Sequence, residues 1–243
     1  MRYLVISDVH ANWEALEAVL HAAKGVYDRV ACLGDLVGYG PDPNRVVEWA
    51  RENVSFAVRG NHDRACVDLI GLDKFRDIAI DSALWTNRTL TEQNSLYLRN
   101  LPQGPLSIED FGIAHGSPRD EDEYLVEVED ATEAFAFAES RITFFGHTHL
   151  QGGFQARKGR VTGLKIQATP AELDFQPDTD YLINPGSVGQ PRDRDPLAAF
   201  ALYTPGEGYL TYGRAGYRIA ATQKKIRAAG LPSVLADRLA VGQ

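Results

Sequence analysis

The chain opens with Tyr3-Leu4-Val5-Ile6-Ser7-Asp8-Val9-His10, a short apolar run that is followed at once by an acid and a histidine. Four successive apolar residues predict a strand that is covered on both faces of its sheet. Apolar residues from Leu16 to Ala23 then repeat at helical spacing, and Gly25 ends that helix. The order of strand, polar loop and helix predicts the start of a parallel α/β sheet.

The same order recurs through the first two thirds of the chain, and the pattern changes after Leu150. Further strands are predicted at 30–33, 56–58, 112–114 and 142–145, with helices around 46–50, 73–100 and 131–140. After Leu150, the Lys158-Gly159 turn predicts a hairpin, more strands follow at 182–183, 198–203 and 209–212, and helices are predicted at 219–229 and 234–239. We therefore expect residues 1–243 to form one α/β domain, parallel first and antiparallel later.

Composition narrows the class of protein. Of 243 residues, 44% are hydrophobic and 24% are charged, and no apolar stretch approaches the roughly 18 residues of a membrane helix. Asp8 comes too early for a signal peptide, and Cys32 and Cys66 form no disulfide framework, so we expect a cytoplasmic protein that does not engage a membrane. The net charge of -8 argues against a nucleic-acid binder with a basic surface, although a local cation would still permit phosphate-ester chemistry. The sequence leaves the oligomeric state open.

Polar residues follow five of the predicted strands. The loops read Asp8-Val9-His10, Gly34-Asp35, Gly60-Asn61-His62-Asp63, Ala114-His115-Gly116 and Gly146-His147-Thr148-His149. Taken alone, each of the first four loops can also be explained as a helix cap, a turn or a buried histidine. The pair His147 and His149 is harder to explain in this way, because alternate residues of an extended segment point the same way. Ligand sites of open α/β sheets lie outside the carboxyl ends of the strands, so five such loops together predict one shared site.

The residue types in these loops indicate a metal site. Two carboxylates, one amide and four imidazoles suit manganese, iron, cobalt, nickel or zinc. Seven ligands exceed what one tetrahedral ion uses, which predicts two ions with a bridging carboxylate. Two metal ions about 3.5 to 4 Å apart promote displacement at phosphorus, because they generate hydroxide at neutral pH and neutralise charge on the nonbridging oxygens.

The ordered series Asp-x-His, Gly-Asp, Gly-Asn-His-Asp, a single His and Gly-His-x-His resembles the calcineurin-like metallophosphoesterase superfamily. The resemblance continues through Asn184-Pro185-Gly186-Ser187-Val188-Gly189, common in small prokaryotic members, and through Gly230-Leu231-Pro232. It implies a four-layer α/β/β/α sandwich with two mixed sheets and a metal site in the loops at the carboxyl ends of the strands. It also implies a dinuclear metal-dependent phosphodiesterase or phosphatase that acts on a small phosphate ester.

The resemblance assigns a role to each motif residue. One metal ion would be held by Asp8, His10 and His149, the other by Asn61, His115 and His147, and Asp35 would bridge them. His62 would be the catalytic histidine that contacts the phosphate and protonates the leaving oxygen, and Asp63 would orient it. Arg59 and Asn61 would contact phosphate oxygens, with Arg192 as a further candidate.

Two departures from specialised relatives bear on the substrate. Gly38 stands where phosphoprotein phosphatases carry an Asp that pairs with the catalytic histidine. Tyr39-Gly40-Pro41 replaces the Arg-Gly-Pro of the symmetrical diadenosine tetraphosphatases, so the arginine for an extra phosphate is absent from this loop. Both departures favour a generic phosphodiesterase or phosphatase, in which the Tyr39 ring either stacks on a base or aryl group or only packs the loop.

Three alternatives to a metal-dependent phosphoesterase remain. An inactive interaction scaffold on the same fold has no need for His62 together with all seven ligands. A diadenosine-tetraphosphatase-like hydrolase lacks support in the Tyr39 loop. A (β/α)₈-barrel amidohydrolase would carry His-x-His after its first strand, where this chain has Asp8-Val9-His10, and would lack hairpins in its last third.

Overall fold

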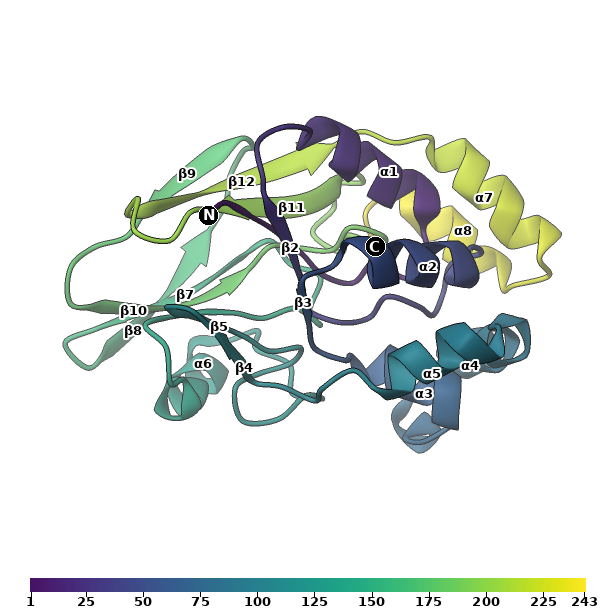
Figure 1. The fold of residues 1–243 in the computed structure, drawn as a ribbon, viewed down its shortest axis with the longest axis horizontal. Coiled ribbons are helices and arrows are strands. Elements are labelled where there is room, and N and C mark those ends of the chain that lie inside the picture. The colour runs from purple at the N-terminus through teal and green to yellow at the C-terminus, as the bar shows by residue number, and fades with distance from the viewer.

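Two six-stranded sheets form the centre of the computed structural model, which describes residues 1–243 (Figure 1). The first sheet has the order β3 (Phe56–Ala57), β2 (Arg29–Cys32), β1 (Tyr3–Ile6), β11 (Ala198–Tyr203), β12 (Tyr209–Ala215), β9 (Ala171–Asp174). The second has the order β4 (Leu106–Ile108), β5 (Phe111–Ile113), β6 (Ile142–Phe144), β10 (Thr179–Asn184), β7 (Gly152–Arg157), β8 (Arg160–Lys165).

Both sheets are mixed. In the first sheet β1, β2 and β3 run parallel, with Tyr3 opposite Arg29 and Ala31 opposite Phe56, whereas β11, β12 and β9 are antiparallel. In the second sheet β5, β6 and β10 run parallel, and β4, β7 and β8 add antiparallel edges. The expected change from parallel to antiparallel pairing along the chain is confirmed.

The two faces of β1 explain how the sheets are stacked. Tyr3 and Val5 belong to an apolar cluster between the two sheets, where the Tyr3 and Phe111 rings lie 5.0 Å apart and the Phe111 and Tyr203 rings 5.3 Å apart. The alternate residues Leu4 and Ile6 belong to the cluster that includes the helices. A strand with apolar residues on both faces is therefore buried on both, as its sequence predicts.

Helices cover the outer face of each sheet. The helices on the first sheet are α1 (Trp13–Ala22), α2 (Pro43–Asn53), α3 (Asn61–Asp68), α4 (Asp77–Thr89) and α5 (Glu92–Arg99). Two further helices, α7 (Ile219–Ala228) and α8 (Ser233–Asp237), pack beside α1 in a separate apolar cluster. On the second sheet α6 (Val128–Ala134) stands alone, with Ala131 and Ala134 packed against Phe145 and Phe154 (Figure 1). The expected four-layer α/β/β/α sandwich is confirmed. No helix combines the length and apolar character that crossing a bilayer requires.

The structure corrects several local expectations. The predicted helix 131–140 divides into α6 and a single 3₁₀ turn at Phe135–Phe137. Two short edge strands, β4 and β9, contain no apolar run and were not predicted. The Asn61 motif is not a loop, because Asn61 is the first residue of α3. Gly60 is the N-cap of this helix, and the Asp63 carboxylate accepts the Gly60 backbone N–H.

Candidate metal centre

The five predicted loops follow β1, β2, β3, β5 and β6, the parallel strands of both sheets except β10. Their carboxyl ends meet where the two sheets face each other, so the loops converge on one buried site. The structure brings together all seven predicted ligand residues, each at most 8% exposed: Asp8, His10, Asp35, Asn61, His115, His147 and His149.

Five of these residues have backbone conformations that side chains rarely adopt. Asp8, His10, Asp35, His147 and His149 all have positive φ, between 48° and 65°. Non-glycine residues in this left-handed region carry strain, and such strain concentrates at functional sites. The surrounding packing therefore holds the loops in shapes that aim the side chains inward.

One group of ligand atoms comes from Asp8, His10 and His149. The Oδ2 atom of Asp8 accepts the backbone N–H of His147 at 3.2 Å, whereas its Oδ1 atom has no hydrogen-bond partner. Oδ1 lies 3.3 Å from His149 Nε2, and the Nε2 atoms of His10 and His149 face each other at 3.2 Å. A buried carboxylate oxygen and two imidazole nitrogens thus point at one space.

A second group comes from Asp35, His115 and His147, with Asn61 beside them. Asp35 Oδ1 accepts the backbone N–H of His62 at 2.9 Å, and its Oδ2 atom has no hydrogen-bond partner. His147 Nε2 also has none, and His115 Nε2 lies 3.1 Å from Asn61 Oδ1. The pattern of the first group is repeated: one oxygen is anchored to the backbone, and the other is free toward the imidazoles.

Asp35 lies between the two groups. Its Oδ2 atom is 3.7 Å from His10 Nε2 in the first group and 3.5 Å from His115 Nε2 in the second. This is the position that a bridging carboxylate requires.

Backbone carbonyls orient three of the imidazoles. His10 Nδ1 donates to Val37 O at 3.0 Å, His115 Nδ1 to Leu33 O at 2.7 Å, and His149 Nδ1 to Gln190 O at 2.6 Å. A carbonyl accepts but cannot donate, so the proton of a neutral ring is held on Nδ1 and Nε2 presents its lone pair to the site. Metal-ligating histidines are commonly oriented in this way.

Burial and charge together set the proton affinities of the site. Burial lowers the pKa of His147 to about 3 and holds that of His10 well below its ordinary value. Burial also disfavours the imidazolium of His115, but the Asp35 carboxylate outweighs it and raises the pKa of His115 to about 10. Protons and cations therefore compete for the same nitrogens in this centre.

His62 stands beside the ligands in an aromatic surround. Its ring centroid lies 4.4 Å from that of Tyr39, 4.6 Å from Phe75 and 5.0 Å from His10, and its Nδ1 atom is buried without a partner. A Cβ atom on Gly38, where φ is +88°, would lie 2.6 Å from His62 Nδ1. The His62 imidazole therefore fits here only because Gly38 has no side chain.

Asp63 does not orient His62, contrary to the sequence-based expectation. Its carboxylate accepts the backbone N–H groups of Asp35 at 2.8 Å, Val37 at 3.2 Å and Gly60 at 3.0 Å. Asp63 instead fixes the loop that carries Asp35 to the start of α3.

Arg59 also differs from expectation. Its guanidinium donates to both carboxylate oxygens of Glu121 at 2.9 Å, and it does not line the cavity at the site. Glu121 therefore holds the Arg59 guanidinium outside the residues that line the cavity.

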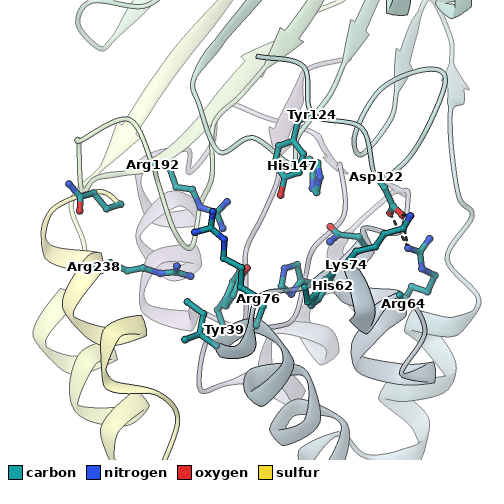
Figure 2. Close-up of a pocket in the computed structure, with 16 residues that line it drawn as sticks. Tyr39, His62, Arg64, Lys74, Arg76, Asp122, Tyr124, His147, Arg192 and Arg238 are labelled. Carbon is teal, nitrogen blue, oxygen red and sulfur yellow. Dashed lines mark hydrogen bonds and ion pairs between the residues drawn. The ribbon is translucent and has the colours of Figure 1, made fainter. Parts of the chain in front are cut away.

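A cavity of about 600 Å³ opens onto the centre (Figure 2). Asn61, His62, His147 and Tyr39 form part of its wall, and the Tyr39 ring, 9% exposed, also packs against the C-terminal helices. The packing role of Tyr39 is therefore present in the structure, and the stacking role stays a prediction.

Sequence reasoning missed most of the charged residues around this cavity. Four cations and two aromatic residues were not predicted: Arg64, Lys74, Phe75, Arg76, Tyr124 and Arg238. Arg64 directly follows the Asn61 motif on α3, and the other five lie on segments without a motif. The sequence singles out only Arg192, near the Asn184 motif, as a candidate cation.

Comparisons with known proteins agree with the observed fold. The profile of the calcineurin-like phosphoesterase superfamily domain matches residues 1–207. The protein MJ0912 of Methanocaldococcus jannaschii is 32% identical over 255 residues, which cover 98% of this chain and 97% of that protein.

Two solved structures have similar folds. A metallophosphoesterase from Sphaerobacter thermophilus is 40% identical, covers 100% of this chain and 99% of its own, and superposes with a TM-score of 0.89. The protein PH1004 from Pyrococcus horikoshii is 18% identical, and the match covers 100% of this chain and 98% of that protein with a TM-score of 0.78. At this identity the likeness shows a shared fold only. Because the family profile spans most of the residues, including every loop of the centre, the chain belongs to the calcineurin-like phosphoesterase superfamily.

Proposed function

We propose that this protein is a dinuclear metal-dependent phosphoesterase that hydrolyses phosphodiester or phosphomonoester bonds of a small substrate. One observation carries the proposal: the orphaned oxygens of two buried carboxylates, Asp8 and Asp35, both face imidazole nitrogens. Leaving a buried charged acceptor unpaired is costly, and a cation in each group would satisfy it.

The donor set fits two divalent ions. Asp8, His10 and His149 would hold one, Asn61, His115 and His147 would hold the other, and Asp35 would contact both. Oxygen and imidazole donors suit manganese, iron, nickel, cobalt or zinc. When bound, such ions supply Lewis acidity that activates water and neutralises charge on the phosphate.

The chain itself would supply the proton-handling group. His62 lines the cavity, and burial lowers its pKa to about 4, so its imidazole is neutral at pH 7. The negative charge of a phosphate bound beside it would raise that pKa, since an adjacent opposite charge favours the protonated ring. We assign His62 to phosphate contact and to protonation of the leaving oxygen.

A metal-by-substrate panel on chelator-treated protein tests the proposal. Manganese, zinc, nickel, cobalt and iron are added in turn, and the substrates are bis-p-nitrophenyl phosphate and p-nitrophenyl phosphate. We expect turnover only with metal and two ions per chain by elemental analysis. The variant His115→Ala should lose both, whereas the matched control His21→Ala, an exposed histidine on α1, should lose neither. Two tightly bound ions with no turnover of any phosphate ester would instead favour an interaction scaffold.

A further inference from the structure

One end of the cavity carries three guanidinium groups that have no carboxylate partner: Arg76, Arg192 and Arg238 (Figure 2). The cations at the other end are paired. Arg64 contacts both Glu121 and Asp122, and Lys74 lies 3.0 Å from Asp122. The cavity therefore has one end with compensated charge and one end with free positive charge.

Arg192 and Arg238 share their surroundings. Both donate to the same neutral acceptor, Gln190 Oε1, at 3.1 and 2.5 Å. Both guanidinium carbons lie near the Tyr39 ring, at 5.9 and 4.6 Å from its centroid. The Arg238 Nε atom is buried without any partner, and burial together with the neighbouring Arg192 lowers the pKa of Arg238 to about 10, so that it stays charged at neutral pH. Several donors thus remain available to a ligand.

This arginine cluster lies next to the metal centre. The Tyr39 ring, which Arg238 covers on one side, is 4.7 Å from the ring of His10. Gln190 connects the cluster to the predicted metal ligands. Its side-chain oxygen accepts hydrogen bonds from Arg192 and Arg238, and its backbone oxygen lies 2.6 Å from His149 Nδ1. The two guanidinium groups are thus only one residue, Gln190, away from the predicted ligand His149.

Arg76 adds a third cation from a different element. It is the N-cap of α4, it is exposed to solvent, and it has no ion-pair partner. The first turn of α4 has no side-chain cap and contains one acid, Asp77, which does not line the cavity, whereas Ile78 and Ala79 of that turn do. The positive end of a helix axis therefore lies at the same cavity wall as the arginines.

We infer that Arg76, Arg192 and Arg238 form a subsite for a second phosphate group of the substrate, next to the phosphorus that is hydrolysed. The inference rests on the proposed function and deepens it. Planar guanidinium groups bind phosphate oxygens in pairs, and three of them match a terminal phosphate better than a singly charged group. A diester of two aryl or alkyl groups offers nothing to this cluster.

The subsite would allow binding of a second phosphate although the Tyr39 loop carries no arginine. Tyr39-Gly40-Pro41 lacks the arginine for an extra phosphate, and the cluster supplies three from the start of α4, from the loop after β10 and from the C-terminal 3₁₀ turn Arg238–Ala240. In ADP the α-phosphorus carries both an ester bond and an anhydride bond. Water adds at this phosphorus, the anhydride bond from it to the bridging oxygen breaks, and one proton of the water is released. The products are AMP and the terminal phosphate, which leaves with the bridging oxygen into the arginine cluster.

Binding to metal-free protein tests the subsite without any turnover. Sodium tripolyphosphate is titrated by calorimetry into chelator-treated and dialysed protein. We expect Arg192→Gln and Arg238→Gln each to weaken binding about tenfold or more, because each removes charge-assisted hydrogen bonds. The matched control is Lys74→Gln, which removes one positive charge from the paired end of the same cavity and should change binding less than twofold. Equal affinities in all four proteins would overturn the inference.

Turnover supplies the second arm. With manganese, kcat/KM is measured for ADP, inorganic pyrophosphate and bis-p-nitrophenyl phosphate. In Arg192→Gln, and in Arg238→Lys as a charge-preserving variant, the ratio of ADP to bis-p-nitrophenyl phosphate should fall about tenfold or more, with pyrophosphate falling in parallel. A loss confined to ADP would mean that the arginines contact the nucleoside, and would overturn the assignment. If no substrate is hydrolysed by wild-type protein, the proposed function fails, and the tripolyphosphate titration still judges the subsite.

Discussion

The substitution Asp35→Asn perturbs the one carboxylate that lies between both ligand groups. In the wild-type protein, Oδ1 is anchored by the His62 backbone N–H and Oδ2 faces His10 Nε2 and His115 Nε2 at 3.7 and 3.5 Å. The amide oxygen can keep the anchor, which places the amide NH₂ toward both imidazoles. The change therefore removes a negative charge from between two cations and offers hydrogen bonds to the nitrogens that should bind them.

The magnitude follows from these distances. Two unit charges 4 Å apart interact by about 4 kcal/mol at an effective dielectric constant of about 20. Since about 1.4 kcal/mol is a factor of ten, the loss of one bridging charge should weaken metal binding by about 10³-fold or more. Calorimetric titration of chelator-treated protein with manganese measures this directly. The comparison variant is Asp63→Asn, a buried acid that accepts three backbone N–H groups, one of them from Asp35, and faces no imidazole. This variant should lower folding stability and weaken metal binding far less than Asp35→Asn does. Wild-type affinity for two ions in Asp35→Asn would refute the bridging role.

Three further changes separate the roles of neighbouring residues. His62→Ala should retain both ions and slow turnover by about 10²–10⁴-fold, because His62 is placed as a proton donor and not as a ligand; loss of metal in elemental analysis would contradict this. Gly38→Asp should lower kcat, since its Cβ would lie 2.6 Å from His62 Nδ1 at a φ of +88°, and a rise in phosphatase activity would show that the loop adapts. Arg59→Gln should lower the unfolding midpoint by breaking the pair with Glu121 and leave KM unchanged, which thermal denaturation and steady-state kinetics together will check.

The convergence of the seven predicted ligand residues on one site follows from a local signal in the sequence. A buried strand such as Tyr3–Ile6 is recognisable from its apolar run, and the topology of a parallel sheet then determines where Asp8 and His10 are delivered. The edge strand Ala171–Asp174 has no such run, since its exposed and half-buried residues alternate, and it was missed.

Side-chain direction was predicted less well than position. Arg59 stands beside the Asn61 motif, but Glu121, distant in sequence, determines where its guanidinium points. Asp63 likewise follows His62 in sequence, yet the helix start turns its carboxylate toward backbone N–H groups. Arg238 carries no local signal at all, because only packing of the C-terminal turn against Tyr39 brings it to the cavity.

Whether two ions share Asp35 can be seen by anomalous scattering from a crystal of manganese-loaded protein. We predict two peaks per chain, about 3.5 to 4 Å apart. One should lie among Asp8, His10 and His149, and the other among Asn61, His115 and His147, with Asp35 in contact with both. A single fully occupied peak, or two peaks of which only one touches Asp35, would rule out a bridging carboxylate.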